Sequence, residues 1–250
     1  MRVRTVRTVP KVRTVLWCQG CLMCLVLVLV LVLVLGATAS AQRSEAPTLR
    51  AHRINVAGGV TWSGSYPAGS RDALLRSSAL GATPPPFTLF SSRSTVESIA
   101  GLDARLGFAL TSNLALEAGG AFARPRVSTA ISADPEVASQ VLAGEQLDQY
   151  VFEAGAVWQL PLRFGRRARP FVTGGAGYLR QLHQGRTLVE QGEIYYAGGG
   201  LRYWLRGGDG LKRSLGLRAD ARAMWKKHGI DFENKTRLFP TLSVGAFLSF

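Results

Sequence analysis

The final stretch of the chain, Leu238–Phe250, constrains its fold more than any other segment. Every second residue counted back from the end is apolar, and the residues between them are mixed in character. A period of two over a stretch of this length predicts a β-strand with two different faces. The strand ends on an aromatic residue, as expected where an apolar face meets lipid and its last ring lies at the membrane interface. The apolar side consists of Leu242, Val244, Ala246, Leu248 and Phe250.

Composition favours a membrane barrel over a bundle of membrane helices. Hydrophobic residues make up 47% of the 250 residues and charged residues 18%, whereas soluble domains usually contain about 25% charged residues. After the N-terminal region, no apolar run reaches the roughly 20 residues that a membrane-spanning helix needs. The apolar residues are instead scattered among small ones, including 28 glycines.

The net charge of +14 does not indicate a nucleic-acid partner. Five of the basic residues lie within residues 1–41, which contain no acidic residue. The rest of the chain has no Lys/Arg-rich helix and no basic patch interleaved with aromatic residues, which are the usual marks of nucleic-acid binding.

Residues 1–41 have the three parts of a secretory signal peptide. A basic segment precedes the apolar run Cys21–Leu35, and small residues at Ala39 and Ala41 follow it. The run is shorter than a membrane anchor needs, so we expect cleavage after Ala41. All three cysteines of the chain lie in this segment, so we expect no disulfide and no thiolate metal site in the body. Residues 42–49 are a short polar leader, and residues 50–250 are predicted to form one barrel domain.

Eight strands are predicted after the leader. Long connections, at residues 65–96, 125–145, 181–193 and 226–237, alternate with short turns, and one of these turns is Ser112-Asn113. Outer-membrane barrels have this alternation, with long loops on the outside and short turns on the periplasmic side. The predicted strands are Arg53–Gly64, Glu97–Thr111, Leu114–Arg124, Asp148–Leu160, Phe171–Arg180, Ile194–Leu205, Ser214–Trp225 and Leu238–Phe250.

Charged side chains and the larger apolar side chains fall on opposite faces of four of these strands. Many residues on the apolar face are alanines, which are too small to fill a core but need no partner against lipid. The charges nearly balance, and paired charge is tolerated in an interior where unpaired charge is not. We therefore predict a polar lumen with cross-strand ion pairs among Asp103, Arg105, Glu117, Glu153, Arg218, Asp220 and Arg222. The alternative is that these residues face solvent.

Aromatic residues gather near the predicted strand ends. Amphipathic rings at both membrane interfaces are typical of barrels in lipid. The sequence therefore predicts an aromatic girdle formed by Trp62, Tyr150, Trp158, Tyr203, Trp204, Trp225 and Phe250.

No catalytic set, metal site or cofactor motif stands out. Enzymatic barrels need a nucleophile or an acid–His set at the membrane edge. His183 with Glu190 or Glu193, and His228 with Asp231 and Glu233, are combinations that could form one, but polar loop residues are usually only solvated. Glycine pairs recur within strands with no helix after them, so we read them as aids to barrel curvature and not as a phosphate loop. We expect no enzyme activity, no cofactor and no metal.

Two segments resemble a known family. The last strand is similar to the C-terminal strand of bacterial outer-membrane barrels, and ARLGFALTSNLALEAGGAF, at residues 104–122, resembles the second hairpin of small OmpA-type barrels. The resemblance implies an eight-stranded antiparallel up-and-down transmembrane β-barrel located in the outer membrane. It also implies partners: outer-membrane lipid, and the barrel-insertion machinery, which would recognise the last strand.

The interior of an eight-stranded barrel is filled by side chains, so we expect no open pore. The predicted function is then structural or surface-interacting, through the long outer loops, with an unknown extracellular partner. Two alternatives remain: a secreted soluble barrel that binds a ligand in its lumen, and a barrel-embedded lipid-modifying enzyme.

Overall fold

The computed structural model describes residues 53–75, 87–133, 138–142, 144–162, 164–165, 167–184, 188–206 and 213–250. The predicted signal peptide, the cysteines and the polar leader lie outside these ranges. Within them, no helix is long and apolar enough to cross a membrane.

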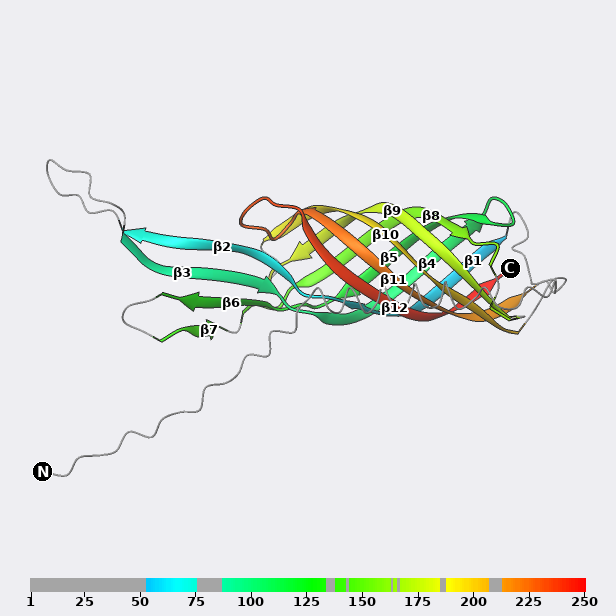
Figure 1. The fold of residues 1–250 in the computed structure, drawn as a ribbon, viewed down its shortest axis with the longest axis horizontal. Coiled ribbons are helices and arrows are strands. Elements are labelled where there is room, and N and C mark those ends of the chain that lie inside the picture. Colours follow the sequence, from blue (N-terminus) through cyan, green and yellow to red (C-terminus); the bar gives the residue numbers. More distant parts are fainter. Residues whose placement is uncertain are drawn as a thin grey trace, which may run out of the picture. The chain divides into compact units, whose positions relative to one another are not determined.

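The structure confirms the predicted fold class, a closed antiparallel barrel of eight strands (Figure 1). Each barrel strand pairs with the barrel strands before and after it along the chain, and β1 closes the ring on β12. The barrel strands are β1 (Ile54–Ser63), β4 (Ile99–Ala109), β5 (Leu114–Ala123), β8 (Asp148–Gln159), β9 (Ala168–Leu182), β10 (Val189–Arg206), β11 (Ser214–His228) and β12 (Arg237–Ser249).

Two segments that we predicted as loops, residues 65–96 and 125–145, contain strands, so that part of the prediction is wrong. They hold β2 (Tyr66–Leu75), β3 (Phe87–Val96), β6 (Val127–Ser132) and β7 (Gln140–Leu142), which form a second sheet in the order β2-β3-β6-β7. The sheet continues the hairpins of the barrel, since only two residues separate β1 from β2 and β3 from β4. β3 and β6 are rich in Ser and Thr, and β7 is only three residues long, so these strands lack the apolar alternation from which a strand is recognised.

The barrel wall is apolar outside and polar inside. On β11 the outward Leu217 is 45% exposed, whereas its inward neighbours Arg218 and Asp220 are 5% and 7% exposed. The same alternation runs along β12, where Val244 is exposed and Ser243 is buried. A soluble barrel has the opposite arrangement, so this wall is built to face hydrocarbon.

Some of the mid-strand glycines are required by close backbone contact inside the barrel. Gly59 lies opposite Gly245 across the β1–β12 pair. A Cβ atom on Gly59 would stand 2.3 Å from the carbonyl oxygen of Val244, and one on Gly245 would stand 2.4 Å from that of Gly58. No side chain fits there, so the strands approach and bend at this point.

Candidate functional site in the barrel interior

Asp220 is the centre of an ion-pair cluster in the middle of the lumen. Its carboxylate accepts hydrogen bonds from Arg218 Nε at 3.0 Å and Arg222 Nε at 2.8 Å. Arg105 Nη1 lies 3.5 Å from Asp220 Oδ2, and Ser243 Oγ donates to Oδ1 at 3.0 Å. One carboxylate on β11 thus holds three guanidinium groups together and links β4, β11 and β12.

The other acidic groups complete the charge balance. Arg105 Nε pairs with Asp103 at 2.7 Å, Arg218 Nη1 pairs with Glu117, and Arg222 Nη1 pairs with Glu153. All seven residues that we proposed for the lumen lie in this one cluster. A buried charge is costly unless it is paired. A shift in strand register would separate these pairs, so the cluster favours the observed registers.

Arg202 on β10 is a member of the cluster that the sequence analysis missed. Its Nη2 lies 3.5 Å from Glu117 Oε2, and it is 3% exposed. It brings the arginines to four, matching the four acids. In the predicted strand Ile194–Leu205 the other residues of both parities are apolar or glycine, so the alternation did not show which face Arg202 occupies.

Aromatic rings and a polar clasp close the lumen toward the short turns. Phe171 and Phe247 lie under the arginines, with the Arg218 Cζ atom 4.7 Å from the Phe171 ring centre. Trp204 is 5% exposed and packs edge-on against Phe247 at 5.7 Å. Its place in the predicted outer girdle is therefore wrong, because on β10 the even-numbered residues point inward. Beyond it, Arg169 donates to Gln159 Oε1 at 3.0 Å and to Asn113 Oδ1 at 2.8 Å.

A plug of apolar residues and two amides closes the other end of the lumen. Gln181 Nε2 donates to Gln149 Oε1 at 2.8 Å and to Tyr66 Oη at 3.1 Å, and Gln181 Oε1 accepts from the backbone N–H of Ile230. Lys226 Nζ donates to the carbonyl of Ile230 at 2.9 Å and lies 4.7 Å from the centre of the Tyr66 ring. The remaining side chains of this core are Ala68, Val96, Leu147, Leu179, Ile194, Tyr196, Met224 and Phe239.

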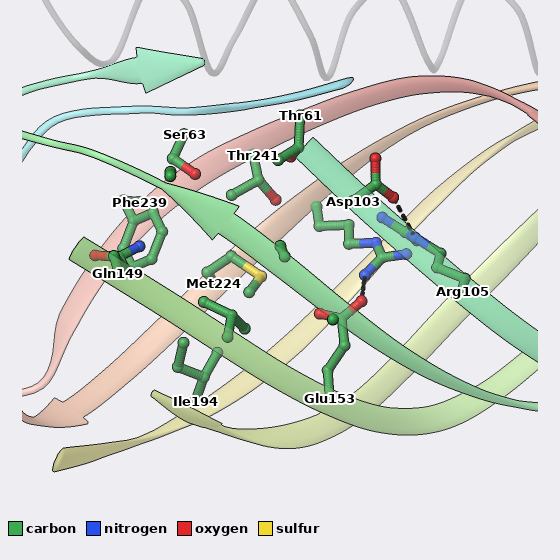
Figure 2. A pocket seen from close by; sticks show the side chains of 15 residues that line it. Thr61, Ser63, Asp103, Arg105, Gln149, Glu153, Ile194, Met224, Phe239 and Thr241 are labelled. Carbon is green, nitrogen blue, oxygen red and sulfur yellow. Dashed lines mark hydrogen bonds and ion pairs between the residues drawn. The ribbon is translucent and has the colours of Figure 1, made fainter. Parts of the chain in front are cut away.

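A small cavity of about 40 Å³ separates the plug from the ion-pair cluster. Figure 2 shows Asp103, Arg105 and Glu153 on its polar side and Ile194, Met224 and Phe239 on its apolar side. A cavity of this size holds at most a few water molecules, whereas small-molecule sites usually measure about 300–1,000 Å³. The lumen as described has no room for a substrate or a carried ligand.

The remaining girdle residues form two groups by their places in the strands. Trp62, Tyr150 and Trp225 lie toward the long connections, whereas Trp158, Tyr203 and Phe250 lie toward the short turns. Of these six, Trp158, Tyr203, Trp225 and Phe250 are exposed, and Trp62 and Tyr150 are partly exposed. This is the arrangement that interfacial anchoring needs.

On the last strand, the proposed insertion signal lies on the outer surface. Its members Leu242, Val244, Ala246, Leu248 and Phe250 are all exposed. They alternate with the inward residues Thr241, Ser243, Phe247 and Ser249, which are buried.

His183 clasps two connections and is not paired with a nucleophile. Its Nδ1 lies 2.9 Å from Glu145 Oε2 and its Nε2 lies 3.8 Å from Glu190 Oε1. The hydrogen bond from His183, together with one from the backbone of Gln184, holds the pKa of the Glu145 carboxyl below its usual value. Glu193 accepts instead from Tyr195 Oη at 3.1 Å.

Asp231 and Glu233, which we considered as partners of His228, instead hold the last connection in place: both pair with Arg237 of β12, and Glu233 also bonds to β2. Arg237 Nη2 pairs with Asp231 at 2.8 Å and with Glu233 at 3.2 Å. Glu233 also accepts from the backbone N–H and hydroxyl of Ser70 at 2.8 and 2.9 Å. Hydrogen bonds from Lys235, Ser70 and Arg237 lower the pKa of Glu233 to about 2. Across the described ranges, no three His, Cys, Asp or Glu residues gather closely enough to hold a metal ion.

Comparison with known proteins finds similar structures but no family. No family model matches the chain, and no curated protein sequence matches it. Among solved structures, the outer membrane protein OprG from Pseudomonas aeruginosa is 12% identical with a TM-score of 0.48, covering 82% of this chain and 99% of that one. Ail, the attachment invasion locus protein of Yersinia pestis, is 13% identical with a TM-score of 0.39, over 80% and 99%. The outer membrane protease OmpT from Escherichia coli is 9% identical with a TM-score of 0.31, over 83% and 99%.

Proposed function

We propose that this protein is an outer-membrane β-barrel that acts as a structural or surface-interaction protein and not as a channel or an enzyme. The observation that carries the proposal is the closed lumen below an exposed second sheet. Three layers of buried side chains fill the barrel: the aromatic layer toward the short turns, the ion-pair cluster and the plug. The interior therefore has no room to bind a substrate or to conduct a solute. Among the residues that the structure describes, the sheet β2-β3-β6-β7 extends beyond the barrel and is free to meet a partner (Figure 1).

The surface of this second sheet supports a role in binding. Phe87 is 58% exposed and Val141 is 70% exposed, and both lie beyond the barrel strands. The edge strand β7 pairs only with β6 among the described strands. Exposed apolar side chains and an open strand edge are features of surfaces that recruit another protein.

Two single-cysteine variants test the membrane placement. All native cysteines lie in residues 1–41, so a mature chain cleaved after Ala41 would carry only the introduced thiol. Val244 is 58% exposed on the outer wall, and Arg93 is exposed on β3, beyond the barrel strands. A spin label at Val244→Cys, in lipid vesicles, should be relaxed by oxygen and not by a water-soluble nickel complex. Arg93→Cys is the control, where the nickel complex should relax the label.

A soluble barrel would give a different result. It would remain monomeric without detergent, and the label at Val244→Cys would report water. Either result would overturn the membrane placement.

Trypsin treatment of intact cells tests the position of the second sheet. Arg71 and Arg93 lie on exposed parts of β2 and β3, whereas Arg218 and Arg222 are buried in the lumen. Cleavage at the first pair in intact cells, with the barrel fragment left whole, is the expected result. Cleavage only after the cells are permeabilised would place the sheet in the periplasm and refute the proposal.

A further inference from the structure

The outer wall of the barrel carries a groove of about 480 Å³ that the proposed function does not use. It lies across β4, β5 and β8 and is lined mainly by Leu102, Ala104, Gly120, Phe122, Tyr150 and Phe152. Ala104 pairs with Gly120, which pairs with Phe152, and the next row is Leu102, Phe122 and Tyr150. The floor is therefore formed by the small residues Ala104 and Gly120. The Phe152 ring bounds it on the β8 side, and the row with Phe122 and Tyr150 bounds it toward the long connections.

Steric packing does not require a glycine at position 120 in the floor of the groove. A Cβ atom on Gly120 would meet nothing closer than 3.8 Å, whereas one on Gly101, whose Cβ would point inward, would stand 2.3 Å from a backbone oxygen. A larger side chain at the floor is therefore sterically acceptable. An empty depression facing hydrocarbon forfeits dispersion contacts, so an apolar chain from the bilayer is its natural occupant.

Two arginines stand at the end of the groove nearest the long connections. Arg124 pairs through Nε with Asp148 at 2.9 Å, and its Cζ lies 5.4 Å from the centre of the Phe122 ring. Arg180 pairs in register with Tyr150, which itself packs against Phe122 with ring centres 4.9 Å apart. Both arginines are exposed. Two guanidinium groups beside one carboxylate leave a net positive charge, and the planar fork of arginine suits phosphate.

We propose that this groove binds one phosphate-bearing lipid, with an acyl chain lying over Ala104 and Gly120 and the phosphate held by Arg124 and Arg180. The inference rests on the proposed membrane placement. The depression selects a chain, and the charge at its mouth selects an anionic headgroup over a neutral one. Since the arginines lie toward the long connections, the lipid belongs to the leaflet on that side.

Native mass spectrometry of the detergent-solubilised full chain tests the site. The probes are phosphatidic acid, diacylglycerol with the same acyl chains, and inorganic phosphate. We expect one phosphatidic acid retained per chain, at least fivefold above diacylglycerol, and no competition by inorganic phosphate. Equal retention of the two lipids, or displacement by phosphate alone, would overturn the proposal.

Matched variants separate the groove from general lipid contact. Ala104→Leu fills the floor, and Ala219→Leu makes the same change on the exposed outer face of β11. The first should lower retention of phosphatidic acid at least fivefold, and the second should leave it unchanged. The double variant Arg124→Gln/Arg180→Gln should bind both lipids alike. Equal retention by the two leucine variants would refute the site.

Failure of this proposal is distinguishable from failure of the proposed function. A heat-dependent shift in gel migration shows that each variant forms a folded barrel. A barrel whose Val244 label contacts lipid, but whose two leucine variants retain lipid equally, keeps the membrane placement and loses only the groove site.

Discussion

Replacement of Asp220 by asparagine tests whether charge balance in the lumen holds the barrel together. The carboxylate serves Arg105, Arg218 and Arg222, and all four residues are at most 7% exposed. Asp220→Asn leaves four buried arginines with three acids. Breaking a buried pair by removing one partner costs about 3–5 kcal/mol, because the remaining charge stays desolvated.

The expected decrease in the free energy of unfolding is large enough to measure by urea titration in detergent or lipid. With a urea dependence of about 2 kcal/mol per molar, the midpoint of unfolding should fall by about 2 M. The matched control is Asp72→Asn, whose carboxylate accepts from Ser91 Oγ at 2.7 Å on the exposed sheet. Loss of that exposed contact should change stability by less than about 0.5 kcal/mol.

A second variant distinguishes charge balance from loss of one hydrogen-bonding group. In the Asp220→Asn background, Arg218→Gln restores equal numbers of buried arginines and acids. Glu117 would still pair with Arg105 and Arg202, each 3.5 Å away in the structure. The double variant should therefore recover about 1–3 kcal/mol relative to the sum of the single changes. Additive losses, or a loss below 1 kcal/mol for Asp220→Asn alone, would show that the cluster is not an interdependent buried network.

Three further predictions concern other parts of the molecule. Trp204→Ala should lower the free energy of unfolding by about 3–5 kcal/mol, since it opens a cavity, whereas the outward Trp158→Ala should cost much less in the same urea titration. Because the pKa of Glu233 is lowered to about 2, its stabilising hydrogen bonds to Ser70 are fully present above its ordinary pKa and are lost as the pH falls through 2; the Ser70 amide shift in NMR spectra should follow that titration and not one near the ordinary value. Phe250→Ala should reduce membrane-assembled protein in cells severalfold while leaving the stability of the refolded barrel nearly unchanged; normal assembly in cells would contradict the role of the last strand as an insertion signal.

Local alternation determined which residues of most barrel strands face inward. The charged residues of β4, β5, β8 and β11 could be placed in the lumen because a strand repeats every two residues, whatever its neighbours are. That rule gave no face for Trp204, since the predicted strand Ile194–Leu205 has apolar or glycine residues at both parities, and its place near a strand end wrongly suggested the outer girdle. Local pattern also missed β2, β3, β6 and β7, because these strands are joined by backbone hydrogen bonds and do not show a regular apolar alternation in the sequence.

Only the tertiary structure decided which groups meet. Asp220 reaches Arg105, and Gln181 reaches Tyr66, across 115 residues of chain in each case. Such contacts depend on the stagger of distant strands, and one residue of slip would turn a whole strand over. The sequence by itself therefore determined a barrel with a polar inside and an apolar outside. Closure of that barrel, which fixes every register at once, decided the Asp220 cluster, the plug around Gln181 and the groove beside Gly120.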